Sequence, residues 1–310
     1  MDYTCKKCAS VLDTSVPFPR TGFCPECGAP LAHEMSGYSV SDYVILAELG
    51  RGANGAVFLA RQRALNREVA LKLLPSEFAG DQNLVRSFFN EARSTARLCH
   101  ANIVQAIDAG VSENGIYFFA MELVDGKSLE TLIADFGAMK FSHVLSVASK
   151  IADAMDYAWE TGRMIHGDIK PANIILNSAG EPKLADLGLA QFDGAGTFEM
   201  ATPLYVSPEV VNGDPSRIDF RADIYSFGAM LYEMFSGEPP FFDLDPGRVI
   251  AMQMNDQPEP LEKRLGFFDP GISKFINSML AKNPADRPNS WHVVARFLRR
   301  NDITAQLKEI

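Results

Sequence analysis

Short apolar runs separated by polar turns dominate residues 43–123 of the chain. The turn-forming segment G-R-G-A-N-G and the polar segment R-Q-R-A-L-N-R separate the first three runs. Runs of this length that are bounded by turn residues predict β-strands. The expected strands cover residues 44–49, 56–60, 68–74, 103–110 and 116–123.

Helical periodicity characterises another segment in this region and most of the chain after it. Between residues 82 and 98 the apolar positions recur with the spacing of one helical face, and helical patterns predominate after Gly126. The later helices are expected at residues 141–161, 221–236, 245–255, 272–281 and 290–299. A strand-rich part followed by a helix-rich part predicts an α+β fold with two lobes.

The composition narrows the class of protein. The chain has 310 residues, 47% of them hydrophobic, which is enough for one or two domains with a buried core. Its formal net charge of −10 argues against non-specific nucleic-acid binding, which depends on a basic surface. No apolar run reaches 18 residues and the N-terminus lacks a signal-type apolar segment. We therefore expect a soluble, cytoplasmic protein without a membrane span.

Four of the five cysteines form two C-x-x-C pairs near the N-terminus, with fifteen residues between the pairs. This spacing is typical of a site in which two tight turns aim four thiolates at one tetrahedral zinc ion. Pro25 and Gly28 favour the second turn, and the segment resembles the zinc-ribbon family. Because it has few large apolar residues, we expect its folding to depend on the metal. The expected zinc ligands are Cys5, Cys8, Cys24 and Cys27.

The alternatives to zinc are iron in the same four-sulfur shell, two disulfides, or thiols with no joint role. We expect the ribbon to cover residues 1–31 and an aperiodic linker to cover residues 32–42, with His33 as a solvated side chain. The ribbon either packs on its neighbour or binds a partner, and the acidic charge favours a protein partner. The fifth cysteine, Cys99, is expected to be a small buried hydrophobic residue.

A glycine-rich segment joins the first two expected strands. Gly50, Gly52 and Gly55 would let the backbone approach phosphates closely, although such glycines also mark plain turns and Rossmann folds. Here they lie between strands, whereas a Rossmann fingerprint opens a helix. Lys72 lies within the third, apolar strand, where a buried charge needs a partner. Glu91 on the following helix is the expected partner rather than a solvated helix charge.

The segment H-G-D-I-K-P-A-N gathers three polar side chains that suit phosphoryl transfer. Asp168 can accept a hydroxyl proton, Lys170 can neutralise a phosphate, and Asn173 can offer its amide oxygen to a metal ion. Asp186 follows in the segment D-L-G, where a carboxylate can bind Mg²⁺, a cation that favours oxygen ligands. The segments S-P-E and D-I-Y-S-F-G come later in the chain.

In this order, the motifs of residues 43–300 resemble those of eukaryotic-type protein kinases of the bacterial Ser/Thr branch. The resemblance implies a bilobal protein-kinase-like fold preceded by the small zinc ribbon. The kinase domain would cover residues 43–310, with an N-lobe at 43–121 and a C-lobe at 125–300. ATP and Mg²⁺ would be its cofactors, with Zn²⁺ in the ribbon, and protein Ser/Thr hydroxyls would accept the phosphate.

The resemblance also implies a role for each motif residue. Asp168 would orient the acceptor hydroxyl and take its proton, Lys170 would meet the γ-phosphate, and Thr202 would bridge these two side chains. The residues implied at the other phosphates are Gly50, Gly52, Gly55, Lys72 and Glu91. Those implied around the adenine are Val57, Ala70, Met121, Glu122, Val124 and Ile175. The implied Mg²⁺ ligands are Asn173 and Asp186, and the implied scaffold residues are Asp223 and a Glu209–Arg287 pair.

Lysine two positions after the acid, together with the segment A-T-P-L-Y-V, favours serine and threonine over tyrosine as the acceptor. Because Gly167 stands where the family pattern has an arginine, it offers no cation to a phosphate on the activation segment. We therefore expect activity that does not depend on phosphorylation of that segment. The alternative is that Arg86 or Arg93 receives such a phosphate. The other departures from the pattern are Leu187 for phenylalanine, Ser207 for alanine and Thr95 for an apolar residue.

Every catalytic polar position is filled, so the sequence predicts an active ATP- and Mg²⁺-dependent Ser/Thr protein kinase. One alternative is an ATP-binding pseudokinase or scaffold that uses the zinc ribbon as a partner-binding adaptor. Another is a small-molecule phosphotransferase of related fold. Lys170, the S-P-E segment and the segment around Asp223 argue for a protein substrate instead.

Overall fold

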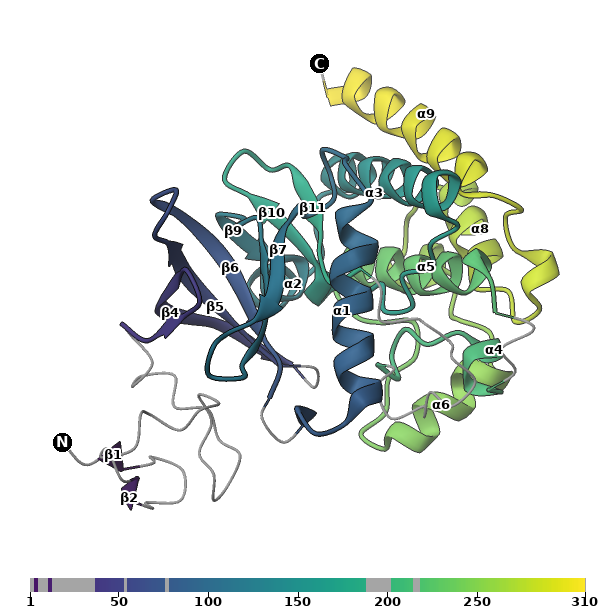
Figure 1. Cartoon of the computed structure of the whole chain (residues 1–310). Helices are drawn as coiled ribbons and strands as arrows, with labels where there is room; N and C mark the ends of the chain where they lie inside the picture. Colours follow the sequence, from purple (N-terminus) through teal and green to yellow (C-terminus); the bar gives the residue numbers. More distant parts are fainter. Residues whose placement is uncertain are drawn as a thin grey trace. The chain divides into compact units, whose positions relative to one another are not determined.

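The computed structural model of the chain describes residues 3–4, 11–12, 37–52, 55–75, 78–187, 202–213 and 218–309. These residues form two compact units (Figure 1). The first unit contains the described residues up to Ala96 together with Val104–Val124, and the second contains Arg97–Ile103 and the described residues from Asp125 onward. The first unit is rich in strands and the second in helices, but Arg97–Ile103, which the predicted N-lobe of residues 43–121 includes, belongs to the second unit. No helix in the described ranges is both long and apolar enough to cross a membrane.

The first unit is built on a six-stranded antiparallel sheet, with the strand order β3-β4-β5-β6-β8-β7. The sequence predicts five of these strands, with ends that differ by a few residues. The strands are β3 (Ser39–Val40), β4 (Tyr43–Gly52), β5 (Gly55–Gln62), β6 (Arg67–Leu73), β7 (Ala106–Val111) and β8 (Tyr117–Met121).

Strand β3 lies inside the segment that the sequence assigns to the linker. Val40 is fully buried, and the Gly37 N–H donates to the Ile45 carbonyl at 2.7 Å. The predicted linker of residues 32–42 therefore contains one strand of the sheet, Ser39–Val40. A strand of two residues is too short to produce a detectable alternation of apolar and polar positions.

Helix α1 (Gln82–Ala96) packs beside β7 and β8 in this unit (Figure 1). The Asp81 carboxylate accepts the Asn83 N–H at 2.8 Å, which satisfies one of the unpaired donors at the start of the helix. The predicted amphipathic face is confirmed, because Phe88 and Ala92 are buried on the side that also carries Glu91.

The second unit is mostly helical, and α5 lies at its centre with nearly every side chain buried. The Asp219 side chain caps the start of α5 by accepting the Arg221 N–H, and Gly237 ends it with a left-handed φ of 82°. The helices predicted from the sequence are α3 (Phe141–Gly162), α5 (Phe220–Ser236), α6 (Pro246–Asn255), α8 (Pro270–Met279) and α9 (Trp291–Glu309). All five are confirmed, and α9 extends well past residue 299, where the predicted helix ends.

Several short elements of this unit have no signal in the apolar pattern. The helices are α2 (Leu129–Phe136), α4 (Pro208–Val211) and α7 (Leu261–Arg264). The strands are β9 (Gly126–Ser128), β10 (Ile174–Asn177) and β11 (Pro182–Leu184), in the sheet order β11-β10-β9. This small sheet matters for the site, because the two residues predicted to bind Mg²⁺ adjoin it. Asn173 lies directly before β10, and Asp186 lies two residues after β11.

The predicted pair of Glu209 and Arg287 is confirmed within the second unit. Both side chains are almost fully buried, and the Arg287 Nη2 donates to Glu209 Oε2 at 2.8 Å. The guanidinium also donates to the carbonyls of Ala281 and Arg221, each at 2.8 Å. A buried ion pair is tolerated only when such hydrogen bonds satisfy both charged groups.

The prediction for Cys99 is wrong, because this thiol is exposed. Its N–H donates to the Tyr157 hydroxyl at 3.2 Å, so the backbone rather than the side chain is anchored. The neighbouring Leu98 takes the buried position, with 1% of its surface exposed. In a turn after a helix, one apolar residue can be buried in the core while the next faces solvent. The sequence around two adjacent apolar residues does not show which of them is the buried one.

Strands β1 (Tyr3–Thr4) and β2 (Val11–Leu12) pair antiparallel near the N-terminus. The segment that connects them contains the first C-x-x-C pair. All four cysteines of the predicted ribbon lie outside the described residues, so the zinc site stays a prediction. In the part of the chain that the structure describes, no group of three or more His, Cys, Asp or Glu side chains is arranged to hold a metal ion.

Candidate active site

Four of the residues predicted to contact a nucleotide share one face of the six-stranded sheet. In the strand register, Val57 lies opposite Lys72, and Ala70 lies opposite Met121. Side chains two positions apart on a strand share a face, so these four side chains lie on one face. The alternating residues of the same strands, such as Phe58, fill the hydrophobic core on the other face.

Lys72 and Glu91 form the predicted buried pair. Lys72 Nζ lies 2.7 Å from Glu91 Oε1, and the side chains are only 5% and 2% exposed. The lysine comes from β6 and the glutamate from α1, so the contact joins the sheet to its helix. At such burial, loss of either partner would leave an uncompensated charge, which typically costs about 3–5 kcal/mol.

The glycines near the end of β4 and at the start of β5 have different steric surroundings. A Cβ at Gly55 would lie 2.4 Å from the Leu73 carbonyl oxygen, and Gly55 has a φ of +136°. At Gly50 a Cβ would meet no atom of the described residues within 4 Å. The packing of β6 against β5 therefore requires glycine at position 55, whereas the described surroundings of position 50 do not.

The remaining predicted adenine contacts are distributed over both units. The Glu122 N–H donates to the Gln105 carbonyl at 2.9 Å, and its carboxylate accepts the Gln105 N–H at 3.1 Å. Val124 follows as a partly buried residue at the end of the first unit. Ile175 belongs to the second unit, where β10 places it opposite Ser128 and Lys183.

Three side chains predicted to act in catalysis meet in the second unit. Lys170 Nζ lies 2.6 Å from Asp168 Oδ2 and donates to Thr202 Oγ1 at 2.9 Å. The Thr202 hydroxyl donates to Asp168 Oδ1 at 3.2 Å. Each carboxylate oxygen of Asp168 therefore has a hydrogen-bonding partner, which holds the acid in one orientation while its side chain stays 12% exposed. A partly exposed, oriented carboxylate suits the acceptance of a proton from a hydroxyl.

Asn173 ends the short 3-10 turn Pro171–Asn173 and lies against the acid. Its Nδ2 donates to the Asp168 carbonyl at 2.8 Å and to Asp168 Oδ2 at 3.2 Å. With the amide nitrogen used in this way, the Asn173 oxygen is the atom that remains for a cation. The Asn173 carbonyl accepts the Ala185 N–H at 2.9 Å, so the loop is tied directly to the residue before Asp186.

Asp186 has a left-handed backbone with a φ of 56°. Non-glycine residues in this conformation are uncommon and cluster at functional sites, and aspartate tolerates it better than most residues. The next residue, Leu187, is 1% exposed, so the predicted apolar plug is confirmed for leucine in place of phenylalanine. The left-handed turn at Asp186 and the burial of Leu187 together fix the backbone of this segment.

Asp223, on α5, anchors the backbone at the start of the H-G-D-I-K-P-A-N segment. Its two oxygens accept the N–H groups of His166 and Gly167, each at 2.7 Å. Burial raises the pKa of Asp223 to about 6, although His166 and the two backbone donors act in the opposite direction. Gly167 has a φ of +76°, a conformation that L side chains rarely adopt. Glycine adopts this backbone conformation without strain. It also lacks the arginine side chain that the family pattern has at this position.

Sequence reasoning missed two side chains that position the segment around Thr202. Gln253, fully buried on α6, donates to the carbonyls of Pro203 and Leu204 at 3.0 and 2.7 Å. The Tyr205 hydroxyl donates to Glu233 Oε2 on α5 at 2.6 Å. A polar residue on an amphipathic helix is normally expected on the solvent-exposed face. The pattern of apolar and polar residues therefore could not have identified Gln253 as a buried residue of the site.

The two other departures from the family pattern are both buried. The Thr95 hydroxyl donates to the Glu91 carbonyl at 2.9 Å, four residues earlier on α1, so the polar group is satisfied within its own helix. Ser207 is 1% exposed, and no hydrogen-bond partner of its hydroxyl lies in the part of the chain that the structure describes. Nothing in the structure explains the choice of serine over alanine there.

Comparison with known proteins gives consistent matches. Residues 43–297 match the family model described as the protein kinase domain. A probable serine/threonine-protein kinase of Clostridium acetobutylicum is 34% identical over 250 residues, which cover 79% of this chain and 37% of that protein. The serine/threonine-protein kinase pkn3 of Myxococcus xanthus is 34% identical over 263 residues, covering 80% of this chain and 48% of that protein.

The fold also matches solved structures. The crystal structure of the Mycobacterium tuberculosis PknI kinase domain superimposes with a TM-score of 0.68 at 30% sequence identity. The match covers 86% of this chain and 97% of that one. The chain spans less than half the length of the two curated relatives named above.

Proposed function

Because this chain belongs to the protein kinase family, we propose that it is a Ser/Thr protein kinase that transfers the γ-phosphate of ATP to protein hydroxyls. The observation that carries this proposal is the contact of Asp168, Lys170 and Thr202 through both oxygens of the acid. A scaffold that only bound ATP would not require this hydrogen-bonded arrangement of a proton acceptor, a cation and a hydroxyl.

Asp168 orients the acceptor hydroxyl and accepts its proton, which is the step that a general base performs. Lys170 places a positive charge beside the acid, where it stabilises negative charge that develops during transfer. Thr202 fixes the positions of Asp168 and Lys170 relative to each other, because its hydroxyl forms hydrogen bonds with both side chains. Gln253 supports this arrangement indirectly, because it holds the carbonyls of Pro203 and Leu204, the two residues after Thr202.

The residues present fit ATP and Mg²⁺. Two oxygen donors, from Asn173 and Asp186, suit a hard cation, and the buried pair of Lys72 and Glu91 suits a phosphate. Bound Mg²⁺–ATP supplies the phosphoryl group and neutralises part of its charge. Of the chain's own residues, Lys72 would hold the α- and β-phosphates, and Val57, Ala70 and Met121 would line the adenine from the sheet face that they share.

Transfer of labelled γ-phosphate from ATP to a generic protein substrate tests the proposal. We expect label on serine and threonine and none on tyrosine, with a requirement for Mg²⁺. Nucleotide binding without any transfer, including autophosphorylation, would favour the pseudokinase instead. Transfer to a small molecule but to no protein would favour the related phosphotransferase.

Activity is expected to be independent of phosphorylation at Thr197. Gly167 cannot pair with a phosphate, and the sequence from Ala185 to Ser216 contains no lysine or arginine. A phosphate on Thr197 would also be close in sequence to Asp193 and Glu199, which would repel it. These three residues lie outside the described part of the chain. The Thr197→Ala variant and phosphatase-treated wild type should both retain transfer activity within about tenfold of the untreated protein.

A larger loss in both samples would show that the segment needs its phosphate. The variant and the treated protein are compared with the same protein substrate, so that a change in substrate preference does not imitate a loss of activity. A loss in the variant alone would identify a role of the threonine side chain rather than of its phosphate.

We also propose that residues 1–31 form a zinc ribbon. The support is the spacing of the four cysteines and the pairing of β1 with β2 on either side of the first C-x-x-C pair. A hairpin brings the ends of such a segment together, which suits a turn that presents two thiolates to one metal. We expect a partner of this ribbon to be a protein rather than a nucleic acid, because the chain is acidic.

The purified chain is expected to contain one zinc ion, bound by Cys5, Cys8, Cys24 and Cys27. A chelator should remove it and unfold the ribbon without loss of the kinase fold, because the ribbon precedes the matched domain. Elemental analysis and thiol titration before and after chelation provide the measurement. Metal-free protein with four freely reactive thiols would contradict the site, and iron in the same shell would correct the metal.

A further inference from the structure

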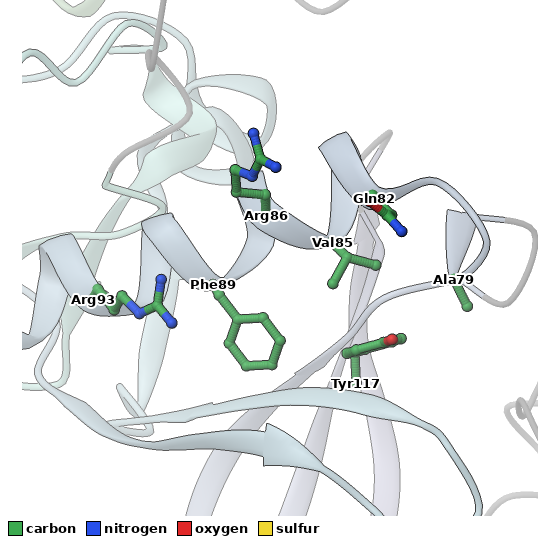
Figure 2. Close-up of a pocket in the computed structure, with 7 residues that line it drawn as sticks. All are labelled: Ala79, Gln82, Val85, Arg86, Phe89, Arg93 and Tyr117. Carbon is green, nitrogen blue, oxygen red and sulfur yellow. The ribbon is translucent and has the colours of Figure 1, made fainter. Parts of the chain in front are cut away.

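A cavity of about 290 Å³ opens beside α1 in the first unit (Figure 2). Figure 2 shows the ring of Phe89 directed from the helix toward the strands. This ring meets the Tyr117 ring of β8 edge to face, with centroids 5.9 Å apart, so the two rings pack α1 on the sheet. A different group of contacts, centred on Lys282 in the second unit, extends to the proposed site.

The two residues after Thr202 form the middle of a tight turn. The Tyr205 N–H donates to the Thr202 carbonyl at 3.1 Å, and Pro203 occupies the second position, where proline favours such a turn. The carbonyls in the middle of a turn need donors from outside it. Gln253 Nε2 donates to those of Pro203 and Leu204 at 3.0 and 2.7 Å. The orientation of the Gln253 amide therefore helps to fix the turn that contains Thr202.

The oxygen of the Gln253 amide is connected to Lys282. The Tyr225 hydroxyl donates to Gln253 Oε1 at 2.6 Å and accepts from Lys282 Nζ at 3.0 Å. Lys282 Nζ also donates to the carbonyl of Met252, the residue before Gln253 on α6, at 3.3 Å. The side chains of Tyr225 and Gln253 are fully buried. The hydrogen bonds run in one direction, from the ammonium through the hydroxyl and the amide to the turn, and hydrogen bonds in such a chain strengthen one another.

The surroundings of Lys282 suit a cation. The residue lies between α8 and the 3-10 turn Pro284–Asp286. Its Nζ is 4.4 Å from the centroid of the Phe241 ring and 5.4 Å from that of the Tyr225 ring, and aromatic faces stabilise an ammonium group. An ammonium group can only donate hydrogen bonds. It therefore leaves the proton of the Tyr225 hydroxyl free to bond the Gln253 oxygen.

We propose that Lys282 is a positioning residue for phosphate transfer. Its ammonium group fixes the Tyr225 hydroxyl and, through it, the Gln253 amide that holds the turn after Thr202. Lys282 itself needs no contact with ATP or with the acceptor protein. The effect on transfer rests on the proposed kinase function, whereas the effect on the turn does not.

Lys282→Met removes the ammonium group and keeps a side chain of similar length. The rate of transfer at saturating substrates should fall by about tenfold or more, because Thr202 no longer fixes Asp168 and Lys170, while ATP affinity should stay within about twofold. Lys274→Met, the same change at an exposed lysine on α8, should alter neither quantity. An unchanged rate in Lys282→Met would overturn the proposal.

A double-mutant cycle separates positioning from a general loss of stability. Gln253→Leu removes the amide, so adding Lys282→Met to this variant should lower the rate by less than about twofold more. A lysine with a merely structural role would lower the rate by the same factor in both backgrounds, and that result would overturn the proposal. If Gln253→Leu does not fold, as judged by tryptophan fluorescence, Tyr225→Phe takes its place in the cycle, because it removes only the hydroxyl.

The charge of Lys282 provides a pH profile as a further readout. Burial lowers the pKa of Lys282 to about 8, while Asp256 raises this pKa and Arg287 lowers it. Burial also raises the pKa of Tyr225, so its hydroxyl keeps the proton. A neutral Lys282 amine can accept that proton and withdraw it from Gln253. The ratio of the wild-type rate to the Lys282→Met rate should therefore fall between about pH 7 and about pH 9, and a constant ratio would overturn the role of the ammonium group.

Hydrogen exchange tests the turn without any need for transfer activity. The Tyr205 amide, which donates to the Thr202 carbonyl, should exchange at least about tenfold faster in Lys282→Met than in the wild type. It should exchange at the wild-type rate in Lys274→Met. Equal exchange in Lys282→Met and the wild type would overturn the proposal. Faster exchange in a chain without any transfer activity would contradict the kinase function and support the role of Lys282 in the turn.

Discussion

Asp168→Asn is expected to lower the rate of phosphate transfer by about 10²–10⁴-fold, the range of general-base contributions. The amide keeps the size of the acid and can still contact Thr202 and Asn173, but it cannot accept a proton from the substrate. Because the acid lies in the second unit and no nucleotide contact is proposed for its side chain, ATP affinity should change little. Steady-state transfer assays and nucleotide titration by calorimetry measure the two effects separately.

Asp186→Asn is the matched comparison, since it changes a carboxylate of the same size in the same unit. Removing a proposed Mg²⁺ ligand should weaken binding of Mg²⁺–ATP and abolish turnover, whereas binding of ATP without Mg²⁺ should be nearly unaffected. If Asp168→Asn instead weakened nucleotide binding and Asp186→Asn did not, the two roles would have to be exchanged. If neither variant reduced transfer, the proposed site would be wrong.

Arg287→Met is expected to lower the free energy of unfolding of the helical unit by about 3–5 kcal/mol, because Glu209 would be left as an unpaired buried carboxylate. The carbonyls of Ala281 and Arg221 would also lose a donor. Urea unfolding followed by tryptophan fluorescence measures the change. Both tryptophans of the chain lie in the helical unit, and Trp291 is fully buried there.

Two further variants test the cause of this loss. Arg299→Met breaks a pair with Asp153 in which the arginine is 58% exposed, so its effect should stay within about 1 kcal/mol. Glu209→Gln combined with Arg287→Met should recover part of the loss, because the unpaired negative charge is then absent. Equal effects of Arg287→Met and Arg299→Met would contradict the importance of burial for this pair.

Much of the architecture follows from local patterns. Five strands of the large sheet and the longer helices agree with the periodicity of apolar residues, because each element must bury one face. The pairing of Lys72 with Glu91 was predictable for a related reason, since a lysine within an apolar strand needs an opposite charge nearby. Short elements such as β3 and β10 were not predictable, because two to four residues do not establish a period.

The residue types that are available for phosphoryl transfer, and their order along the chain, are evident in the amino-acid sequence. The contacts between them arise from tertiary packing, which brings Thr202 to Asp168, 34 residues earlier, and Asp223 to the backbone of His166, 57 residues earlier. Local propensity acts over a few residues, whereas such contacts depend on how α5 and its neighbours pack. In the first unit, the approach of β6, and not a local preference, requires glycine at position 55.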